Sequence, residues 1–156
     1  MSNNYVVPTS KAVAGLLAMI FGDGLGADAV ELADLGDLHV ATFIDDDDNL
    51  VALCASDKEF VAYSGAALSM IPADVANDMI SGNAVTDAMV SNFHEVMNIC
   101  SKLLMTESGA HLRLDRVLKP EEASSAIGAL QDAPKSAGFA IAIPQYGTGR
   151  LSFIVS

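Results

Sequence analysis

Hydrophobic residues recur every three or four positions in two long segments of the chain, the spacing that puts them on one face of a helix. The first segment begins at Thr9 or Ser10, either of which can cap a helix, and ends at the glycine-rich GDGLG. The second extends from Thr86 to about Met105. Its continuous apolar stripe consists of Met89, Val90, Phe93, Val96, Met97, Cys100, Leu103 and Leu104. Both segments are predicted to be amphipathic helices.

Shorter segments are β-branched or alternate apolar and polar residues, as strands do. These segments are LHVATFI, NLVALCAS, KEFVAYSG, HLRLDRVL and the two halves of GFAIAIPQYGTGRLSFIVS. The first two flank DDDDN and predict a β-hairpin, whereas KEFVAYSG predicts a strand less clearly. The last segment predicts two strands around a turn at residues 147–149.

Two further helices are predicted among these strands. One occupies the later part of SGAALSMIPADVANDMISGN, where Pro72 suits a first turn and Gly82 a helix end. The other begins in KPEEASSAIGALQ, at a proline that two glutamates follow. Because hairpins pair antiparallel, the expected fold class is α+β, a mainly antiparallel sheet covered on one face by long helices. A long helix followed by two strands occurs from residue 9 and again from residue 86, a weak internal echo.

The composition narrows the function classes. With 156 residues, 51% of them hydrophobic, the chain can bury one core, and we expect one domain over residues 1–156. Its longest uncharged apolar runs are about a dozen residues, and MSNNYVVPTSK has neither a basic start nor a cleavage site, so a cytoplasmic protein is expected. A net charge of −12 argues against nucleic acid and anionic membranes as partners. Cys54 and Cys100 lie in apolar surroundings and are expected to be buried thiols, not a disulfide.

The acidic run at residues 45–48 suggests a cation site but lacks the rest of one. Asp45, Asp47 and Asn49 have the spacing that opens a calcium loop. Leu50 stands where a glycine must turn that loop, and Ser56 stands where a glutamate must close it. The run is therefore interpreted as a solvated hairpin tip.

Phosphate, metal and triad motifs are absent as well. GDGLG follows a helix and not a strand, so it does not have the context of a phosphate-binding loop. His39, His94 and His111 are scattered, each without a second ligand at metal spacing. No Ser or Cys stands in a nucleophile turn. We predict no metal site of the protein's own.

The second long helix carries a polar ridge. At about 100° per residue, Ser91, Glu95, Asn98 and Lys102 fall within about 60° of one another, nearly opposite the apolar stripe. Every amphipathic helix has a polar side, so ordinary surface is one interpretation. Asn98 is the unusual member, because Asn inside a helix costs about half a kcal/mol relative to Ala and competes for backbone hydrogen bonds.

The spacing Ser91-x3-Glu95-x2-Asn98, with Pro120 after 21 intervening residues, resembles the signature of the CheC/CheX/FliY phosphatases of bacterial chemotaxis. The resemblance implies a CheC-like domain that hydrolyses the aspartyl phosphate of a CheY-type receiver domain. It implies that Asn98 orients the attacking water and that Glu95 contacts the receiver's lysine. Ser91 and Lys102 become contact residues. The receiver itself supplies Mg²⁺, so no cofactor of the phosphatase is expected.

The first long helix lacks a second copy of this signature. At the corresponding positions it has Ser10, Ala14 and Leu17, so both working residues are missing. One site per chain resembles CheX, whose single-site subunits pair, and a homodimer is therefore expected. Two other interpretations remain: a non-catalytic module of the same fold that docks a receiver or motor-switch protein, and an unrelated ligand-binding domain whose ridge is plain surface.

Overall fold

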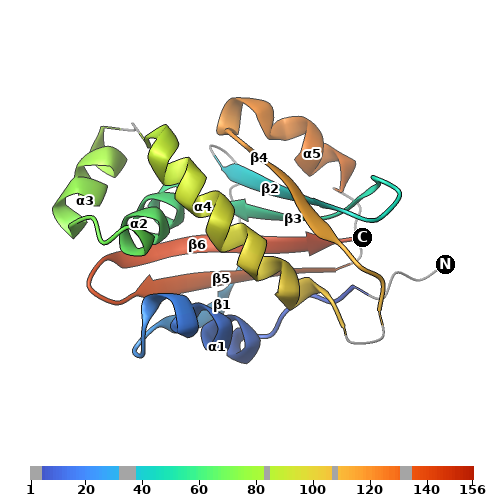
Figure 1. Cartoon of the computed structure of the whole chain (residues 1–156), viewed down its shortest axis with the longest axis horizontal. Coiled ribbons are helices and arrows are strands. Elements are labelled where there is room, and N and C mark those ends of the chain that lie inside the picture. The colour runs from blue at the N-terminus through green and yellow to red at the C-terminus, as the bar shows by residue number, and fades with distance from the viewer. Residues whose placement is uncertain (1–4, 32–37, 83–84, 107–108, 131–134) are drawn as a thin grey trace.

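A computed structural model of the chain describes residues 5–31, 38–82, 85–106, 109–130 and 135–156. In these residues six strands form one antiparallel sheet in the order β1-β5-β6-β3-β2-β4 (Figure 1). The strands are β1 (Gly26–Val30), β2 (His39–Ile44), β3 (Leu50–Ser56), β4 (Arg113–Leu118), β5 (Lys135–Ile143) and β6 (Gly147–Val155). The predicted α+β class with an antiparallel sheet is confirmed.

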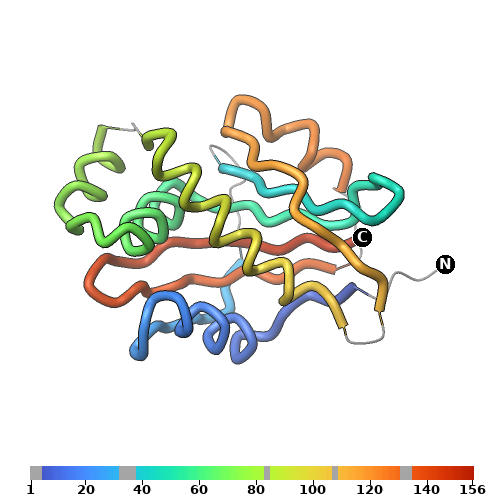
Figure 2. The backbone as a smooth tube through the Cα atoms, viewed as in Figure 1, coloured from blue at the N-terminus to red at the C-terminus, as the bar shows by residue number. Residues whose placement is uncertain are grey.

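Five α-helices and two short 3₁₀ helices complete the described part of the chain. They are α1 (Ser10–Phe21), α2 (Lys58–Leu68), α3 (Ala73–Ser81), α4 (Asp87–Cys100), η1 (Ser101–Leu104), η2 (Pro120–Glu122) and α5 (Ser124–Ala129). The predicted ends of the first helix are confirmed, since Thr9 caps α1 and Gly22 ends it with a φ of 101°. Figure 2 shows α4 crossing the strands of the sheet obliquely.

Helices cover both faces of the sheet, so the expectation of one covered face is wrong. A larger core lies between the sheet and α1, α2 and α4. A smaller core joins the opposite face of β2 and β3 to α5. The reason lies in these two strands, because Val40 and Leu53 face α5 while Phe43 and Cys54 face the larger core. Strands that are buried on both faces need cover on both.

The strand order is unchanged when the two halves of the chain are exchanged. Helix α1 precedes β1, β2 and β3, and α4 precedes β4, β5 and β6. Exchanging β1 with β4, β2 with β5 and β3 with β6 gives the same order read from the other edge of the sheet, so every pair of neighbours is kept. The central pair is β3 with β6, where Cys54 lies opposite Phe153. Each half therefore gives its first strand to the other half, since β1 pairs with β5 and β4 pairs with β2.

Two local features differ from the sequence prediction. KEFVAYSG forms most of helix α2 and not a strand, because Asp57 accepts a hydrogen bond from the Phe60 amide at 2.8 Å and caps the helix. The small residues of this segment let α2 pack closely between the sheet and α4. Its apolar pattern is therefore not that of a surface helix. Strand β1 was not predicted, since it is a short edge strand in which Asp28 and Ala29 are exposed.

The turn between β5 and β6 comes earlier than predicted. The Tyr146 amide donates to the Ile143 carbonyl at 3.0 Å, which places the turn before residues 147–149. Those residues belong to β6, where the glycines make room for helix α2. A Cβ atom on Gly149 would lie 2.3 Å from Cα of Phe60. The glycines reflect this close packing and not the turn.

The two cysteines are free and completely buried, as predicted. Burial raises the pKa of the Cys54 thiol well above its ordinary value and that of Cys100 to about 12. Both thiols therefore stay protonated at neutral pH and pack as apolar side chains.

Candidate functional site

Helix α4 holds the candidate site, and its two sides differ sharply in burial. Thr86 caps the helix by accepting a hydrogen bond from the Met89 amide at 3.3 Å. The apolar side packs into the larger core through Met89, Phe93, Val96, Met97 and Cys100. The opposite side faces solvent, so the predicted stripe and ridge are both present in the structure.

The four residues of the ridge are all exposed. Ser91, Glu95 and Asn98 lie on successive turns of α4, whereas Lys102 lies in η1, where the helix tightens. In the residues that the structure describes, the side chains of Glu95 and Asn98 have no hydrogen bond or ion pair. Residues three apart on a helix are surface neighbours. A carboxylate and an amide are therefore presented together to whatever contacts this helix.

Polar and aromatic contacts with α2 fix the position of α4. Asn92 donates hydrogen bonds from Nδ2 to the Gly65 carbonyl at 2.9 Å and to the Ser69 hydroxyl at 2.6 Å. Phe60 and Phe93 meet edge to face with their ring centroids 6.1 Å apart. Because α4 is held on its inner side, Glu95 and Asn98 stand on a rigid element, which favours precise positioning.

A groove runs beside the ridge, between α4 and β4. Its volume is about 490 Å³, and it is lined by Asp87, Val90, Ser91, His94, Asp115, Arg116 and Val117. His94 and Arg116 were not predicted as site residues from the sequence. His94 follows Ser91 by three positions on the helix, and that spacing is the signal that would have found it.

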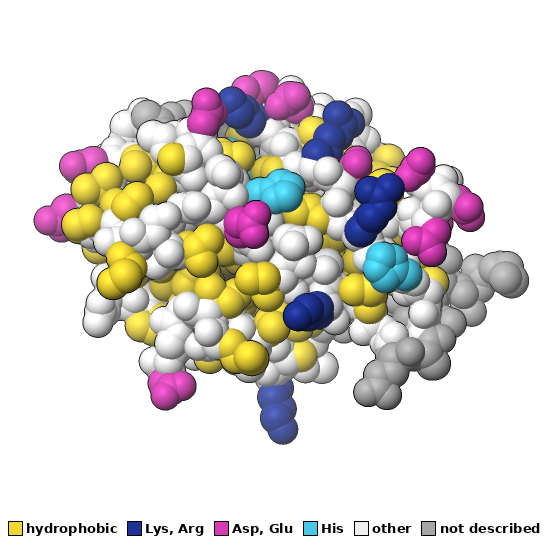
Figure 3. All heavy atoms as spheres, viewed as in Figure 1, with side chains coloured by type: hydrophobic (Ala, Val, Ile, Leu, Met, Phe, Trp, Pro, Cys, Tyr) yellow, Lys and Arg dark blue, Asp and Glu magenta, His cyan; other side chains and the backbone are white. Residues whose placement is uncertain are grey.

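Half of the basic residues lie in the segment that runs from η1 to the start of η2, although the protein is strongly acidic. Four of the eight Lys and Arg residues fall between positions 102 and 119: Lys102, Arg113, Arg116 and Lys119. On the face that α4 crosses, acidic side chains lie mainly around the rim (Figure 3). A partner that docks on α4 therefore meets less negative charge than the net charge of −12 suggests.

The first helix offers no equivalent site. Leu17 of α1 is completely buried, and Ala14 is half-buried. The position that corresponds to Asn98 therefore belongs to the core, and among the described helices only α4 carries the signature. Pro120, the last residue of the spacing, begins η2, and the preceding Lys119 reaches Asp87 at the start of α4 with a distance of 3.3 Å.

The hairpin tip is satisfied by its own hydrogen bonds. Asp45 accepts bonds from the amides of Asp47 and Asn49, each at 2.9 Å. The bonds with Asn49 are the main cause of the lowered pKa of Asp45. In the described ranges, no three His, Cys, Asp or Glu side chains are grouped so that they could hold a metal ion. Within the same ranges, every helix is too short or too polar for a membrane span.

No protein-family model matches the sequence, and no curated protein matches it. Solved structures do match. A FliM–SpeE complex from H. pylori aligns over 94% of this chain and 80% of the matched chain, with 7% identity and a TM-score of 0.59. The FliM middle domain from H. pylori aligns over 94% and 84%, with 9% identity and a TM-score of 0.54. This chain has the fold of the FliM middle domain.

A CheX protein from Desulfovibrio desulfuricans also aligns, over 94% of this chain and 95% of that one, with 10% identity and a TM-score of 0.45. The FliM matches are the ones that carry the fold assignment. The predicted CheC-like fold, which the FliM middle domain shares, is confirmed. Such low identities show the fold alone.

Proposed function

We propose that this protein is a phosphatase that hydrolyses the aspartyl phosphate of a CheY-type receiver domain. The observation that carries the proposal is the pair Glu95 and Asn98, which is exposed and unpartnered among the described residues and lies on a rigid helix. The spacing of the pair is that of the phosphatase signature, and the fold of the protein is of the CheC-like type.

The proposed chemistry needs little from the phosphatase. The phosphorylated receiver brings its own Mg²⁺ and a lysine, which neutralise the phosphoryl oxygens. The missing component is a water molecule held in line with the bond that breaks. The Asn98 amide accepts a hydrogen bond through its oxygen and donates through its nitrogen, so it can orient this water. Water attacks phosphorus, the bond to the aspartyl oxygen breaks, and inorganic phosphate leaves a free carboxylate.

Glu95 serves in docking. Its carboxylate lies one turn before Asn98 and is free to pair with the receiver's lysine, which sets the register of the two proteins. Ser91 and Lys102 flank this pair as contact residues, and the groove lined by His94 and Arg116 extends the surface beside Ser91.

A second candidate function is a non-catalytic docking module of the same fold, for a receiver or a motor-switch protein. Its support is the match to a structure in which FliM is in complex with SpeE, because that fold forms a protein complex there. The two functions differ in one respect: the module binds a phosphorylated receiver without shortening the lifetime of its phosphate.

The test uses a panel of receiver domains loaded with acetyl phosphate and measures the release of inorganic phosphate. We expect the protein to accelerate release from at least one receiver, and Asn98→Ala to slow that reaction by about 100-fold or more. Ser125→Ala, at an exposed position on α5, is the control and keeps the activity. Binding without acceleration supports the docking module. If the protein neither binds any receiver nor accelerates its dephosphorylation, the phosphatase function and receiver docking are both rejected.

A further inference from the structure

A second polar cavity lies beside the first turns of α4. Its volume is about 460 Å³, and it is lined by His39, Lys58, Val85, Val90, Lys119, Pro120 and Glu121. It shares only Val90 with the groove beside the ridge. The lining comes from β2, the start of α2, the start of α4 and the connection into η2, four segments that the fold brings together.

His39 has an unsatisfied nitrogen. The residue is 6% exposed, and within the described residues its buried Nδ1 has no hydrogen-bond partner. Burial lowers the pKa of His39, so the ring is neutral near pH 7. A neutral imidazole carries its proton on one nitrogen. With Nδ1 buried and unpaired, the proton is placed on Nε2, which can then donate to a group in the cavity that His39 lines.

Lys58 is a second group without a partner. It is half-buried, and in the part of the chain that the structure describes it makes no ion pair. It is also the first residue of α2, where the amides already create positive potential and a cation is unfavourable. An anion in the cavity would pair with Lys58 and would also offset the positive potential at the start of α2.

Lys119 adds a third nitrogen to the lining of the cavity. Its pair with Asp87 is exposed and 3.3 Å long, so it is weak and can be exchanged. Glu121 is the single acidic residue among those that line the cavity. Two of the eight Lys and Arg residues of an acidic protein thus line the same cavity as a buried histidine.

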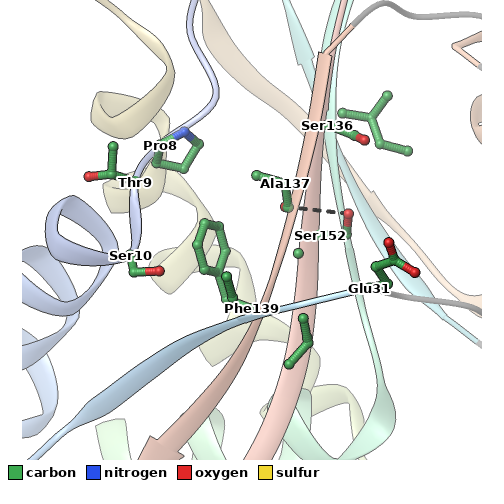
Figure 4. A pocket seen from close by; sticks show the side chains of 12 residues that line it. Pro8, Thr9, Ser10, Glu31, Ser136, Ala137, Phe139 and Ser152 are labelled. Atoms are coloured by element: carbon green, nitrogen blue, oxygen red, sulfur yellow. Dashed lines mark hydrogen bonds between the residues drawn. The ribbon is translucent and has the colours of Figure 1, made fainter.

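Another hollow in the described structure, larger than this cavity, lacks these properties. It has a volume of about 850 Å³ and lies between the start of α1 and strands β1, β5 and β6. Figure 4 shows small side chains along it, with Ser152 bonded to the Ala137 carbonyl and Glu31 as the one charged group. No cation lines it.

We propose that the cavity at His39 binds an oxyanion, the phosphoryl or carboxylate group of a small molecule, between Lys58, Lys119 and the Nε2 proton of His39. Two ammonium groups and an imidazole N–H can each donate to an anionic acceptor, and hydrogen bonds to a charged group are the strong ones. This site is independent of the proposed phosphatase activity, since none of its residues belongs to the ridge.

The test follows the imidazole signals of His39 by NMR while the whole protein is titrated with inorganic phosphate or with succinate. Sodium chloride at the same ionic strength is the reference. We expect a saturable shift with at least one of the two anions, which also tells a phosphoryl site from a carboxylate site. Lys58→Ala should weaken this binding by about tenfold or more, because a charge-assisted contact is lost.

Lys11→Ala is the matched control. Lys11 also occupies the first turn of a helix, but it is exposed and does not line the cavity. Its loss should leave the affinity within about twofold. Lys58→Met keeps the apolar stem and replaces Lys58→Ala if that variant unfolds. Asn98→Ala should bind the anion like the wild type, so failure of the phosphatase proposal leaves this one intact.

Three results would overturn the proposal. Shifts that follow ionic strength without saturation mean that only screening is observed. Equal losses in Lys58→Ala and Lys11→Ala mean that the cavity has no special role. A crystal structure at saturating phosphate with an ordered water as the sole neighbour of the His39 ring shows a hydrated cavity and not an anion site.

Discussion

Gly65 of α2 lies against Met89 of α4 so closely that a Cβ atom on Gly65 would be 3.0 Å from the Met89 carbonyl oxygen. The same turn of α2 supplies the carbonyl that accepts from Asn92. The absence of a side chain at one position thus sets the distance between the two helices. The helix that carries the ridge depends on this contact for its place.

Gly65→Ala should therefore destabilise the protein by about 1–3 kcal/mol, because the methyl group meets backbone and not a flexible side-chain end. Urea unfolding measures this change. Gly15→Ala in α1 is the control, since nothing lies within 4 Å of its added Cβ, and it should be neutral or stabilising. Equal stability of the two variants would show that the helices adjust freely.

Glu95→Lys separates a docking residue from ordinary surface. If Glu95 pairs with a receiver's lysine, the new lysine places like charges opposite each other, and affinity for a beryllofluoride-loaded receiver should fall by at least about tenfold. The melting temperature should stay native, because Glu95 is exposed and lysine is a good helix former. Glu122→Lys, an exposed site in η2, is the charge-matched control. Unchanged affinity in Glu95→Lys would show that the ridge is ordinary solvent-exposed surface and not a docking site.

His39 should make stability depend on pH. Its pKa in the folded protein lies below the ordinary 6.5, mainly through burial, with Glu121 opposing and Lys119 adding to the shift. As pH falls through 6.5, the unfolded chain takes up a proton before the folded one, so stability decreases and levels off once the folded ring is protonated. Asp57, whose pKa burial raises, acts in the opposite direction and near its own lower ordinary value of 3.8.

The measurement is the free energy of unfolding at several pH values between about 7.5 and 5. His39→Gln should remove part of the decrease, because glutamine does not titrate. His94 and His111 remain in both proteins, so the difference between the two curves belongs to His39. Superimposable curves would contradict a buried neutral imidazole.

The protein should be a homodimer with one ridge per subunit. Edge strands β1 and β4 leave backbone groups unpaired within the described sheet, and such edges favour pairing between copies. Light scattering should give about twice the chain mass of 16.2 kDa. A mass of one chain at working concentration would refute the expectation.

The parts of this fold that the sequence predicted are those that local chemistry determines. Apolar stripes that begin at Thr9 and Thr86 predict helices α1 and α4, and the exposed ridge follows from the same periodicity. Helix α2 was not predicted, because its small residues reflect packing against β6, α3 and α4 and do not follow the pattern of a surface helix. The cap at Asp57 is the local signal that identifies it.

The cavity at His39 could not be predicted from the sequence for another reason. Its lining residues come from positions 39, 58, 85–90 and 119–121, so no spacing in the sequence joins them. Only the sheet order and the docking of α4 make them neighbours. The ridge, which lies on one helix, was open to prediction, and this cavity was not.

The exchange of first strands between the two halves also determines the order in which the sheet can assemble. The β2–β3 hairpin needs only its own short turn, but Gly26 of β1 pairs with Ala142, more than 100 residues later. Pairing over such a separation is slow, and during synthesis β1 has no neighbour until β5 has emerged. A chain cut before residue 135 would keep the pairs of β3, β2 and β4 and leave β1 without a partner strand and β3 as a new open edge, both available to another copy in the same condition.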